Sequence, residues 1–218
     1  MGFEEAEIRY DSRPLGSSFS IPSDFLMDVP TAVLISGGGT TLKNLLAVRK
    51  EGNLPADIRL VISSSASAKG LDFATAEGIA TAVVQKSKYP SDEDYSQAIF
   101  DPCRERGIGL VVMAGFLKHV LIPEDYEGRV INIHPSLIPA FCGPGMYGRR
   151  VHQAAIDKGV HFSGCTVHFV DNHYDNGPII LQRSCPVEPT DTAETLAARV
   201  FEEECLALPE AIRKIASK

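Results

Sequence analysis

An amide and an imidazole stand two residues apart at the end of an apolar run, in the segment VINIHPSLIP (residues 130–139). Residues i and i+2 of an extended chain point to the same side, so Asn132 and His134 share one face if this run is a strand. An amide donor beside an imidazole can stabilise a developing oxyanion and move a proton. Taken alone, such a pair is more often an ordinary buried, hydrogen-bonded Asn and His. The sequence gives less reason to expect a catalytic role for the other histidines, which are His119, His152, His161, His168 and His173.

A second segment, VDNHYDNGPIILQ (residues 170–182), carries carboxylates between two apolar runs. A carboxylate close to His134 would favour the protonated imidazole and could accept a proton from an attacking amine. Asp171 and Asp175 are the candidates for this role, but Asp and Asn are also common turn residues. Spacing alone leaves both interpretations open.

The segment SGGGTTLKNLL (residues 36–46) places three glycines between an apolar run and an amphipathic stretch. Glycines allow a tight turn, and Thr40 and Thr41 add hydroxyls beside the free N–H groups of a helix start, which suits one phosphate. The segment is neither a dinucleotide fingerprint nor a P-loop, because Leu42 stands at the third glycine position and no lysine follows in register. A plain turn between strand and helix is the alternative.

Short apolar runs rich in β-branched residues alternate with helical patterns over most of the chain, which predicts βαβ units and a parallel sheet. The runs are residues 31–36, 58–64, 80–85, 109–115 and 129–134. Near the end, SGCTVHFV and PIILQRSCPVE flank DNHYDNG, a hairpin signal, and a last helix is expected at residues 192–218. We therefore predict an α/β fold with a Rossmann-like, mostly parallel sheet flanked by helices and C-terminal antiparallel strands.

The first part of the chain differs from the rest. Residues 1–29 are rich in Ser, Pro and Gly without periodicity, and we expect an N-terminal extension that is loose or laid over the surface. Residues 30–218 show neither internal repeats nor a linker. We predict that they form a single domain.

Charge and composition argue against several classes of protein. Lys plus Arg total 21 against 28 Asp plus Glu, which gives a net charge of −7 and few cations to neutralise nucleic acid or an anionic membrane. No stretch approaches the roughly 20 apolar residues of a membrane span, and no signal-peptide core follows the N-terminus. The 5 cysteines show no zinc-like spacing. We predict a cytoplasmic protein without metal, nucleic-acid or membrane partners; its oligomeric state stays open, with a homodimer among the alternatives.

Four segments together resemble the folate-dependent formyltransferase family: VLISGGGTTLKNLL, VVMAGFLKHV, INIHPSLIPAF and GCTVHFVDNHYDNGPIILQ. The match runs in order from about Thr31 to Pro209, and NIHPSL followed by DNGPIILQ is highly specific for this family. The resemblance implies the formyltransferase fold. It also implies transfer of a formyl group from 10-formyltetrahydrofolate to the amino group of glycinamide ribonucleotide, a step of de novo purine biosynthesis, with no metal.

The resemblance also implies roles for individual residues. Asn132 and protonated His134 would stabilise the oxyanion, and Asp175 would support His134 and relay the amine proton to the folate nitrogen that leaves. Residues implied at the phosphate and nucleotide of the acceptor are Gly38, Gly39, Thr40, Thr41 and Glu204. Residues implied at the folate are Leu117, Lys118, His119, Val120, Asn132, Asp171, Asn172, His173, Tyr174 and Asp175.

The chain departs from the family pattern in three places. Thr40 and Thr41 stand where the family often has Ser-Asn, and their hydroxyls can still donate. The segment YPSDEDY lacks a family Arg that helps to bind folate, so that Lys86 or Lys88 substitutes or the contact is lost. The segment AFCGPGMYGRRVHQAAI is longer than in many members, and we expect a reshaped loop at residues 140–150 beside the site.

Three other functions compete with this interpretation. Formyltetrahydrofolate deformylase, a hydrolase, would use the same three residues with water as acceptor, but a phosphate loop is useful only for a phosphorylated acceptor. Methionyl-tRNA formyltransferase is disfavoured because an acidic surface repels tRNA. A non-catalytic folate or nucleotide binder is disfavoured by the intact set of Asn132, His134 and Asp175.

Overall fold

The computed structural model describes residues 28–217, and within them the strands form one sheet of order β3-β2-β1-β4-β5-β6-β7. Neighbouring strands from β3 to β5 pair in parallel, whereas β6 pairs antiparallel with both β5 and β7. This arrangement confirms the predicted α/β fold with C-terminal antiparallel strands. The strands are β1 (Val29–Ile35), β2 (Ala56–Ser63), β3 (Ala80–Val83), β4 (Leu110–Met113), β5 (Val130–His134), β6 (Phe162–Phe169) and β7 (Ile179–Pro186).

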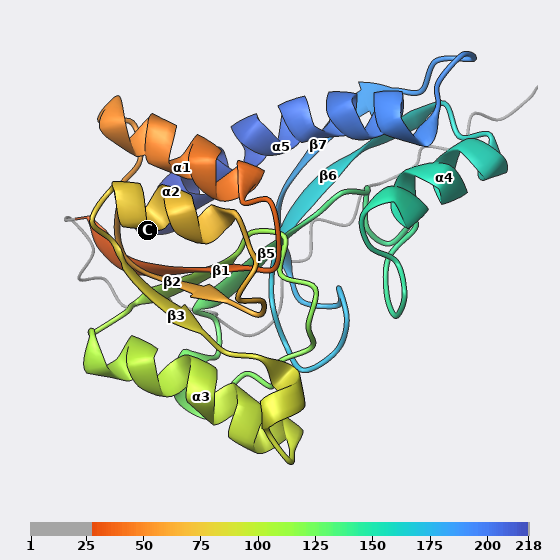
Figure 1. Cartoon of the computed structure of the whole chain (residues 1–218). Coiled ribbons are helices and arrows are strands. Elements are labelled where there is room, and N and C mark those ends of the chain that lie inside the picture. The colour runs from red at the N-terminus through yellow and green to blue at the C-terminus, as the bar shows by residue number, and fades with distance from the viewer. Residues whose placement is uncertain (1–27, 218) are drawn as a thin grey trace, which may run out of the picture.

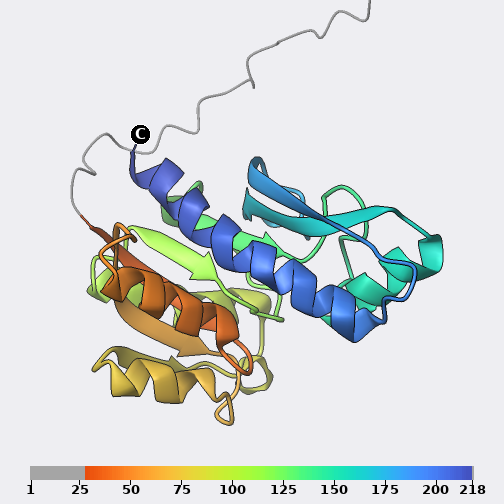
Figure 2. The ribbon, with the colours of Figure 1, turned by 90° about the horizontal axis from the view of Figure 1, so that it is seen from above.

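Helices cover both faces of this sheet (Figure 1). Helices α1, α2 and α5 lie on one face and α3 lies on the other, while Figure 2 shows α5 running between α1 and the β6–β7 hairpin. The helices are α1 (Thr40–Lys50), α2 (Gly70–Ala76), α3 (Asp92–Glu105), α4 (Arg149–Lys158) and α5 (Ala193–Ala216), with short 3-10 turns η1 (Lys86–Lys88) and η2 (Glu124–Tyr126). No helix of the described residues is long and apolar enough to cross a membrane.

Helix α4 corrects one expectation. The sequence predicts a reshaped loop at residues 140–150, whereas the last two of these residues already belong to α4, which begins at Arg149. The usual start signal is missing because Gly148, not Ser, Thr, Asp or Asn, precedes the helix. The irregular stretch is therefore residues 140–148.

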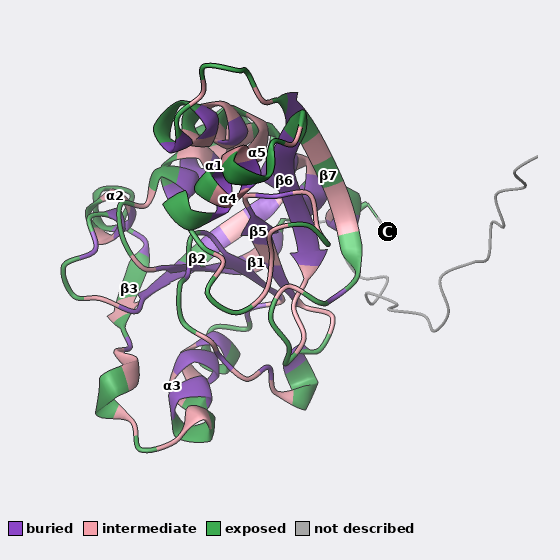
Figure 3. Ribbon diagram, turned by 90° about the vertical axis from the view of Figure 1, so that its right-hand side faces the viewer, coloured by how far each residue is buried: buried purple, intermediate pink, exposed green. Residues whose placement is uncertain are grey.

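Alternating side chains of the central strands build two cores, one on each face of the sheet. In β1, Val33 and Ile35 join the core under α1 and α5, while Ala32 and Leu34 join the core under α3. Figure 3 shows the central strands buried and the edge strand β7 only partly so. This packing fixes the strand ends that carry the functional side chains.

The predicted N-terminal extension, residues 1–29, falls almost entirely outside the described residues. Strand β1 begins at Val29, which is buried, one residue before the expected domain start. The extension and the single domain stay predictions.

The loop after β1 packs against the start of α2 through two glycines. Gly39 has φ 71°, and a Cβ there would lie 2.4 Å from the Cα of Gly70. The N–H of Gly70 also donates to the carbonyl of Gly37 at 3.2 Å. The start of α1 is therefore held by a backbone contact that leaves no room for a side chain.

We expect Gly39→Ala to lower the free energy of unfolding more than Gly52→Ala does. Both positions have left-handed backbone, with φ 71° and 74°, which costs an alanine roughly 1–2 kcal/mol. Only Gly39 adds a steric overlap, because nothing lies within 4 Å of a Cβ at Gly52. Urea unfolding of the two variants measures the difference. An equal decrease in the free energy of unfolding would show that the backbone at Gly39 and Gly70 adjusts to the added Cβ without loss of stability.

Candidate active site

The pairing of β5 with β6 sets Asn132 directly opposite His168. Asn132 Nδ2 lies 3.2 Å from His168 Nε2, and His168 Nδ1 lies 2.8 Å from the carbonyl oxygen of Phe169. A carbonyl only accepts, so the proton of the ring sits on Nδ1 and Nε2 accepts from Asn132. Burial lowers the pKa of His168, which favours this neutral ring. His168 therefore fixes which way the Asn132 amide points.

His134 lies at the end of β5 and is only 4% exposed. Its Nε2 donates to the carbonyl oxygen of Phe141 at 3.0 Å, and its Nδ1 lies 3.6 Å from Asp175 Oδ2. Both contacts are favourable together when each ring nitrogen carries a proton, because a carbonyl and a carboxylate both accept. The geometry therefore places one acceptor beside each ring nitrogen of His134.

Asp175 comes from the loop that joins β6 to β7 and folds back toward β5. Its Oδ2 also accepts from the N–H of Gly143 at 2.8 Å, and its Oδ1 lies 3.8 Å from His168 Nε2. The structure thus brings together Asn132, His134 and Asp175, the three residues named as catalytic. An amide donor and an imidazolium donor next to a carboxylate can stabilise an oxyanion and receive a proton.

These residues line a cavity of about 340 Å³, within the usual size of a small-molecule site. Part of its wall comes from the segment after β4 and from the β6–β7 loop, where the rings of His119 and Tyr174 lie 4.8 Å apart. The expected folate residues on its wall, beyond Asn132 and Asp175, are Leu117, Lys118, His119, Val120, Asp171, His173 and Tyr174. Asn172 is not part of this wall; its Oδ1 accepts from the N–H of Ile122 at 2.7 Å and ties the loop down.

Another part of the cavity lies between α1, α4 and α5. Thr41 and Glu204 are on its wall, whereas Gly38, Gly39 and Thr40 lie just outside it. Gly39 precedes α1, whose first turn has neither a side-chain cap nor an acidic residue. The free N–H groups of this helix start are therefore open to an anion.

Burial raises the pKa of Glu204 to about 7. The burial of Glu204 could not be predicted from the acidic run 202–204, because such a run usually lies on a solvated helix face. The structure separates the three: Glu202 is exposed, Glu203 pairs with Arg183 at 2.7 Å, and Glu204 faces the cavity.

Two histidines given weak claims by the sequence belong to the site: His168, which holds Asn132, and His152, which lines the acceptor end. A usable signal for His168 was the alternation in TVHFV, which puts Thr166 and His168 on one face of a buried strand. For His152 no signal existed without its helix. His161, by contrast, is exposed and lies outside the cavity wall.

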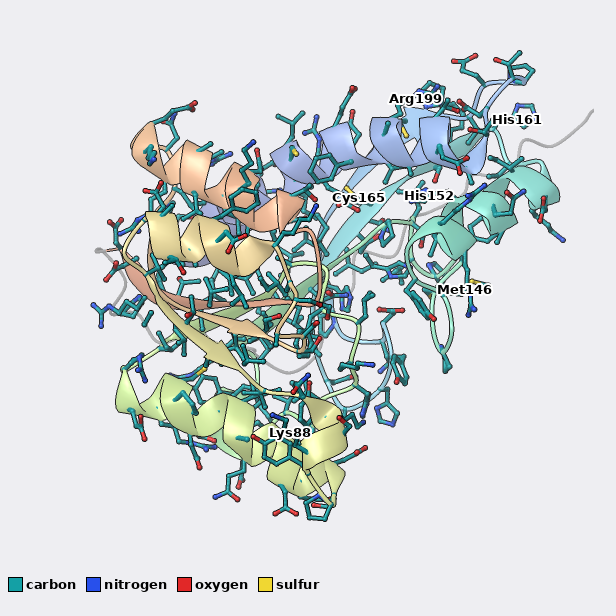
Figure 4. The ribbon with its side chains drawn as sticks, viewed as in Figure 1. Lys88, Met146, His152, His161, Cys165 and Arg199 are labelled. Carbon is teal, nitrogen blue, oxygen red and sulfur yellow. The ribbon has the colours of Figure 1, made fainter. Side chains whose placement is uncertain are left out.

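The lysines considered as replacements for the missing Arg do not line the cavity. Lys86 pairs with Asp92 at 3.0 Å, and Lys88 is exposed on the α3 side of the sheet (Figure 4). Lys118 is the lysine on the cavity wall. Among residues 28–217, no group of three or more His, Cys, Asp or Glu could hold a metal ion.

Comparison with known proteins places this site in a family. Residues 30–212 match the family model described as Formyl transferase. The chain belongs to the formyl transferase family. A crystal structure of glycinamide ribonucleotide transformylase 1 from Symbiobacterium toebii matches with a TM-score of 0.80 and 38% identity, covering 87% of this chain and 88% of that one.

Named relatives of this formyl transferase differ widely in length. Phosphoribosylglycinamide formyltransferase of Haemophilus influenzae is 37% identical, with 84% of each chain covered. The chloroplastic phosphoribosylglycinamide formyltransferase of Vigna unguiculata is 41% identical over 79% of this chain but only 56% of that relative. The match to the trifunctional purine biosynthetic protein adenosine-3 of Gallus gallus covers 18% of that protein.

The raised pKa of Glu204 predicts that wild-type stability falls as pH rises. The folded carboxyl holds its proton up to about pH 7 and the unfolded one up to about 4.5. The folded state therefore binds more protons between these values, and the free energy of unfolding declines through this window. We expect Glu204→Gln to be more stable than wild type by roughly 2–3 kcal/mol above about pH 8, and by almost nothing below about pH 4.5.

Urea unfolding across this pH range checks the expectation, with Glu202→Gln as the matched control. Glu202 is exposed on the same helix, so its replacement should give a difference that does not vary with pH. A Glu204→Gln difference that is equally flat would mean that Glu204 ionises in the folded protein as freely as in water.

Proposed function

We propose that this protein transfers the formyl group of 10-formyltetrahydrofolate to the amino group of glycinamide ribonucleotide in de novo purine biosynthesis. The observation that carries the proposal is that Asn132, His134 and Asp175 line one cavity together with His119 and Tyr174 and with Thr41 and Glu204. The paired rings of His119 and Tyr174 suit a flat folate, and the end at the start of α1 suits a phosphorylated acceptor. The names of the relatives agree with this assignment.

In this proposal the amine of the acceptor attacks the formyl carbon and makes a new C–N bond. The formyl oxygen takes up negative charge, which Asn132 Nδ2 and His134 stabilise as hydrogen-bond donors. Asp175 accepts the proton of the attacking amine, directly or through water, and passes it on as the bond to the folate nitrogen breaks. The products are a formamide and the folate carrying that proton.

The carbonyl of Phe141 has a part in this step. It holds the Nε2–H of His134 at 3.0 Å in the present structure, so the forming oxyanion competes with it for the same donor. An oxyanion is the stronger acceptor because hydrogen bonds to charged groups are roughly twice as strong as neutral ones. The donor therefore shifts toward the substrate as charge develops.

The cytoplasmic location is predicted from the sequence, and the oligomeric state, with a homodimer among the alternatives, stays open. The relatives from Vigna unguiculata and Arabidopsis thaliana are both named chloroplastic. Localisation is therefore a separate proposal from the reaction.

Loss of 10-formyltetrahydrofolate, followed by absorbance with and without glycinamide ribonucleotide, tests the proposed reaction. We expect consumption only when the ribonucleotide is present, together with stoichiometric formylated product. Equal consumption without it would make water the acceptor, and the protein a formyltetrahydrofolate deformylase. No consumption in either case would contradict both enzymes.

We expect Asn132→Ala to lower kcat by about 10²–10³-fold, because it removes one donor to the oxyanion. The KM values should change far less, since the lost interaction strengthens only in the transition state. His161→Ala, an exposed histidine outside the cavity wall, is the control and should retain wild-type kinetics. A loss expressed only in KM would assign Asn132 to substrate binding instead.

A further inference from the structure

His152 is a buried histidine without a hydrogen-bond partner at Nδ1 among the described residues. The residue is only 4% exposed, although it lies on the cavity wall. Buried polar atoms in native proteins are nearly always paired, and an unpaired one is costly enough to need an explanation. Nδ1 itself is out of a ligand's reach, but the other ring nitrogen, Nε2, is not among the buried atoms and makes no hydrogen bond among the described residues, so Nε2 is the atom that a ligand in the cavity can meet.

The position of His152 limits what that ligand atom can be. Figure 4 shows His152 on α4, on the side that faces α5, where Glu204 lines the same cavity. Several residues of the same wall have no polar side chain, namely Pro135, Met146, Gly148, Ala197 and Phe201, whereas Thr41 and Tyr147 each carry a hydroxyl. His152 and Glu204 are the ionisable side chains that α4 and α5 contribute to the cavity wall.

The charge state of His152 narrows the ligand further. Burial, and next the nearby His134, lower its pKa, so its ring is neutral near pH 7. A neutral imidazole has one donor and one acceptor nitrogen, as a hydroxyl has one donor and acceptor lone pairs. A neutral ring in an apolar wall suits a hydroxyl better than a phosphate or a carboxylate, which demand a cation or several donors.

The proposed acceptor carries hydroxyls in the required place. With its phosphate at the start of α1 and its amine at His134, its ribose lies in the segment of cavity between these points. A carboxyl oxygen of Glu204 can accept the proton of a ribose hydroxyl. The oxygen of that hydroxyl, or of its neighbour, then needs a second partner.

Resting on the proposed function, we propose that His152 hydrogen-bonds a ribose hydroxyl of the acceptor opposite Glu204 and so selects for a ribose. It is a specificity residue for the acceptor and has no part in formyl transfer itself. Its loss therefore raises the KM for the acceptor and leaves kcat and the KM for the formyl donor almost unchanged.

The test compares wild type, His152→Leu and His152→Asn with glycinamide ribonucleotide and with its 2′-deoxy and 3′-deoxy analogues. We expect His152→Leu to raise the KM for the ribonucleotide about tenfold or more, and His152→Asn, which keeps a donor and an acceptor, to recover part of this loss. One deoxy analogue should bind poorly to wild type, and His152→Leu should no longer distinguish it from the ribonucleotide as strongly. His161→Leu, an exposed histidine replaced in the same way, should behave as wild type.

Several results would overturn the inference. An unchanged KM for the ribonucleotide in His152→Leu would mean that the ring touches no ribose hydroxyl. The same conclusion would follow if each deoxy analogue raised the KM by the same factor in His152→Leu as in wild type. Should His152→Leu fail to fold, wild type that accepts both deoxy analogues as well as the ribonucleotide would rule out the contact without any variant. Absence of wild-type turnover with the ribonucleotide would instead reject the proposed function, and this inference with it.

Discussion

The antiparallel register between β5 and β6 is the constraint on which the site depends. It sets Asn132 opposite His168 and His134 opposite Thr166, so one strand supplies the chemistry and the other holds it in place. A slip of one residue would turn every one of these side chains to the other face of the sheet. Thr166 helps to prevent a slip: its hydroxyl donates to the carbonyl of Ser136 at 2.7 Å and accepts from the N–H of Ile138 at 3.1 Å.

The same contacts carry the register into the loop after β5. By holding Ser136 and Ile138, Thr166 directs the chain toward residues 140–148, where the backbone meets both ionisable members of the site. Phe141 accepts from His134, and Gly143 donates to Asp175. Phe141 has φ 53°, a conformation that non-glycine residues adopt only where their surroundings enforce it. The imidazole and the carboxylate are thus placed by one loop, so a change in its backbone displaces both together.

Much of the fold was predictable because its signals are local. Apolar runs marked the strands, and Ser91 before an acidic turn marked the start of α3, where its hydroxyl accepts from the N–H of Asp94. Helix α4 was missed because its start signal is a glycine in a glycine-rich stretch, where a loop is the natural interpretation. Helix α1 also follows a glycine, but there an apolar run and an amphipathic stretch on either side of the glycines marked a strand and a helix.

The contacts of the site likewise fall into those that one segment of sequence predicts and those that depend on long-range packing. Asn132 and His134 could be paired from sequence because two residues of one strand share a face. Their contact with Asp175 could not be derived from spacing, because it depends on how far the β6–β7 loop folds back; the family resemblance supplied it. The partnership of Asn132 with His168 depends on a register that no single segment encodes, and the environment of Glu204 depends on how α5 packs. Long-range pairing and burial are the parts that sequence patterns leave out.

An acidic chain can bind the proposed anionic acceptor because the groups that would bind its phosphate lie apart from the acidic side chains of the site. In the proposed function, backbone N–H groups at the start of α1 would bind the phosphate of the acceptor, and their effect does not depend on net charge. At the other point, His134 Nδ1 lies 3.6 Å from Asp175 Oδ2. Between these two points, burial favours the uncharged forms of Glu204 and His152. A stretch of cavity whose buried groups favour their uncharged forms matches the proposed acceptor, in which an uncharged sugar joins a charged phosphate to the reactive amine.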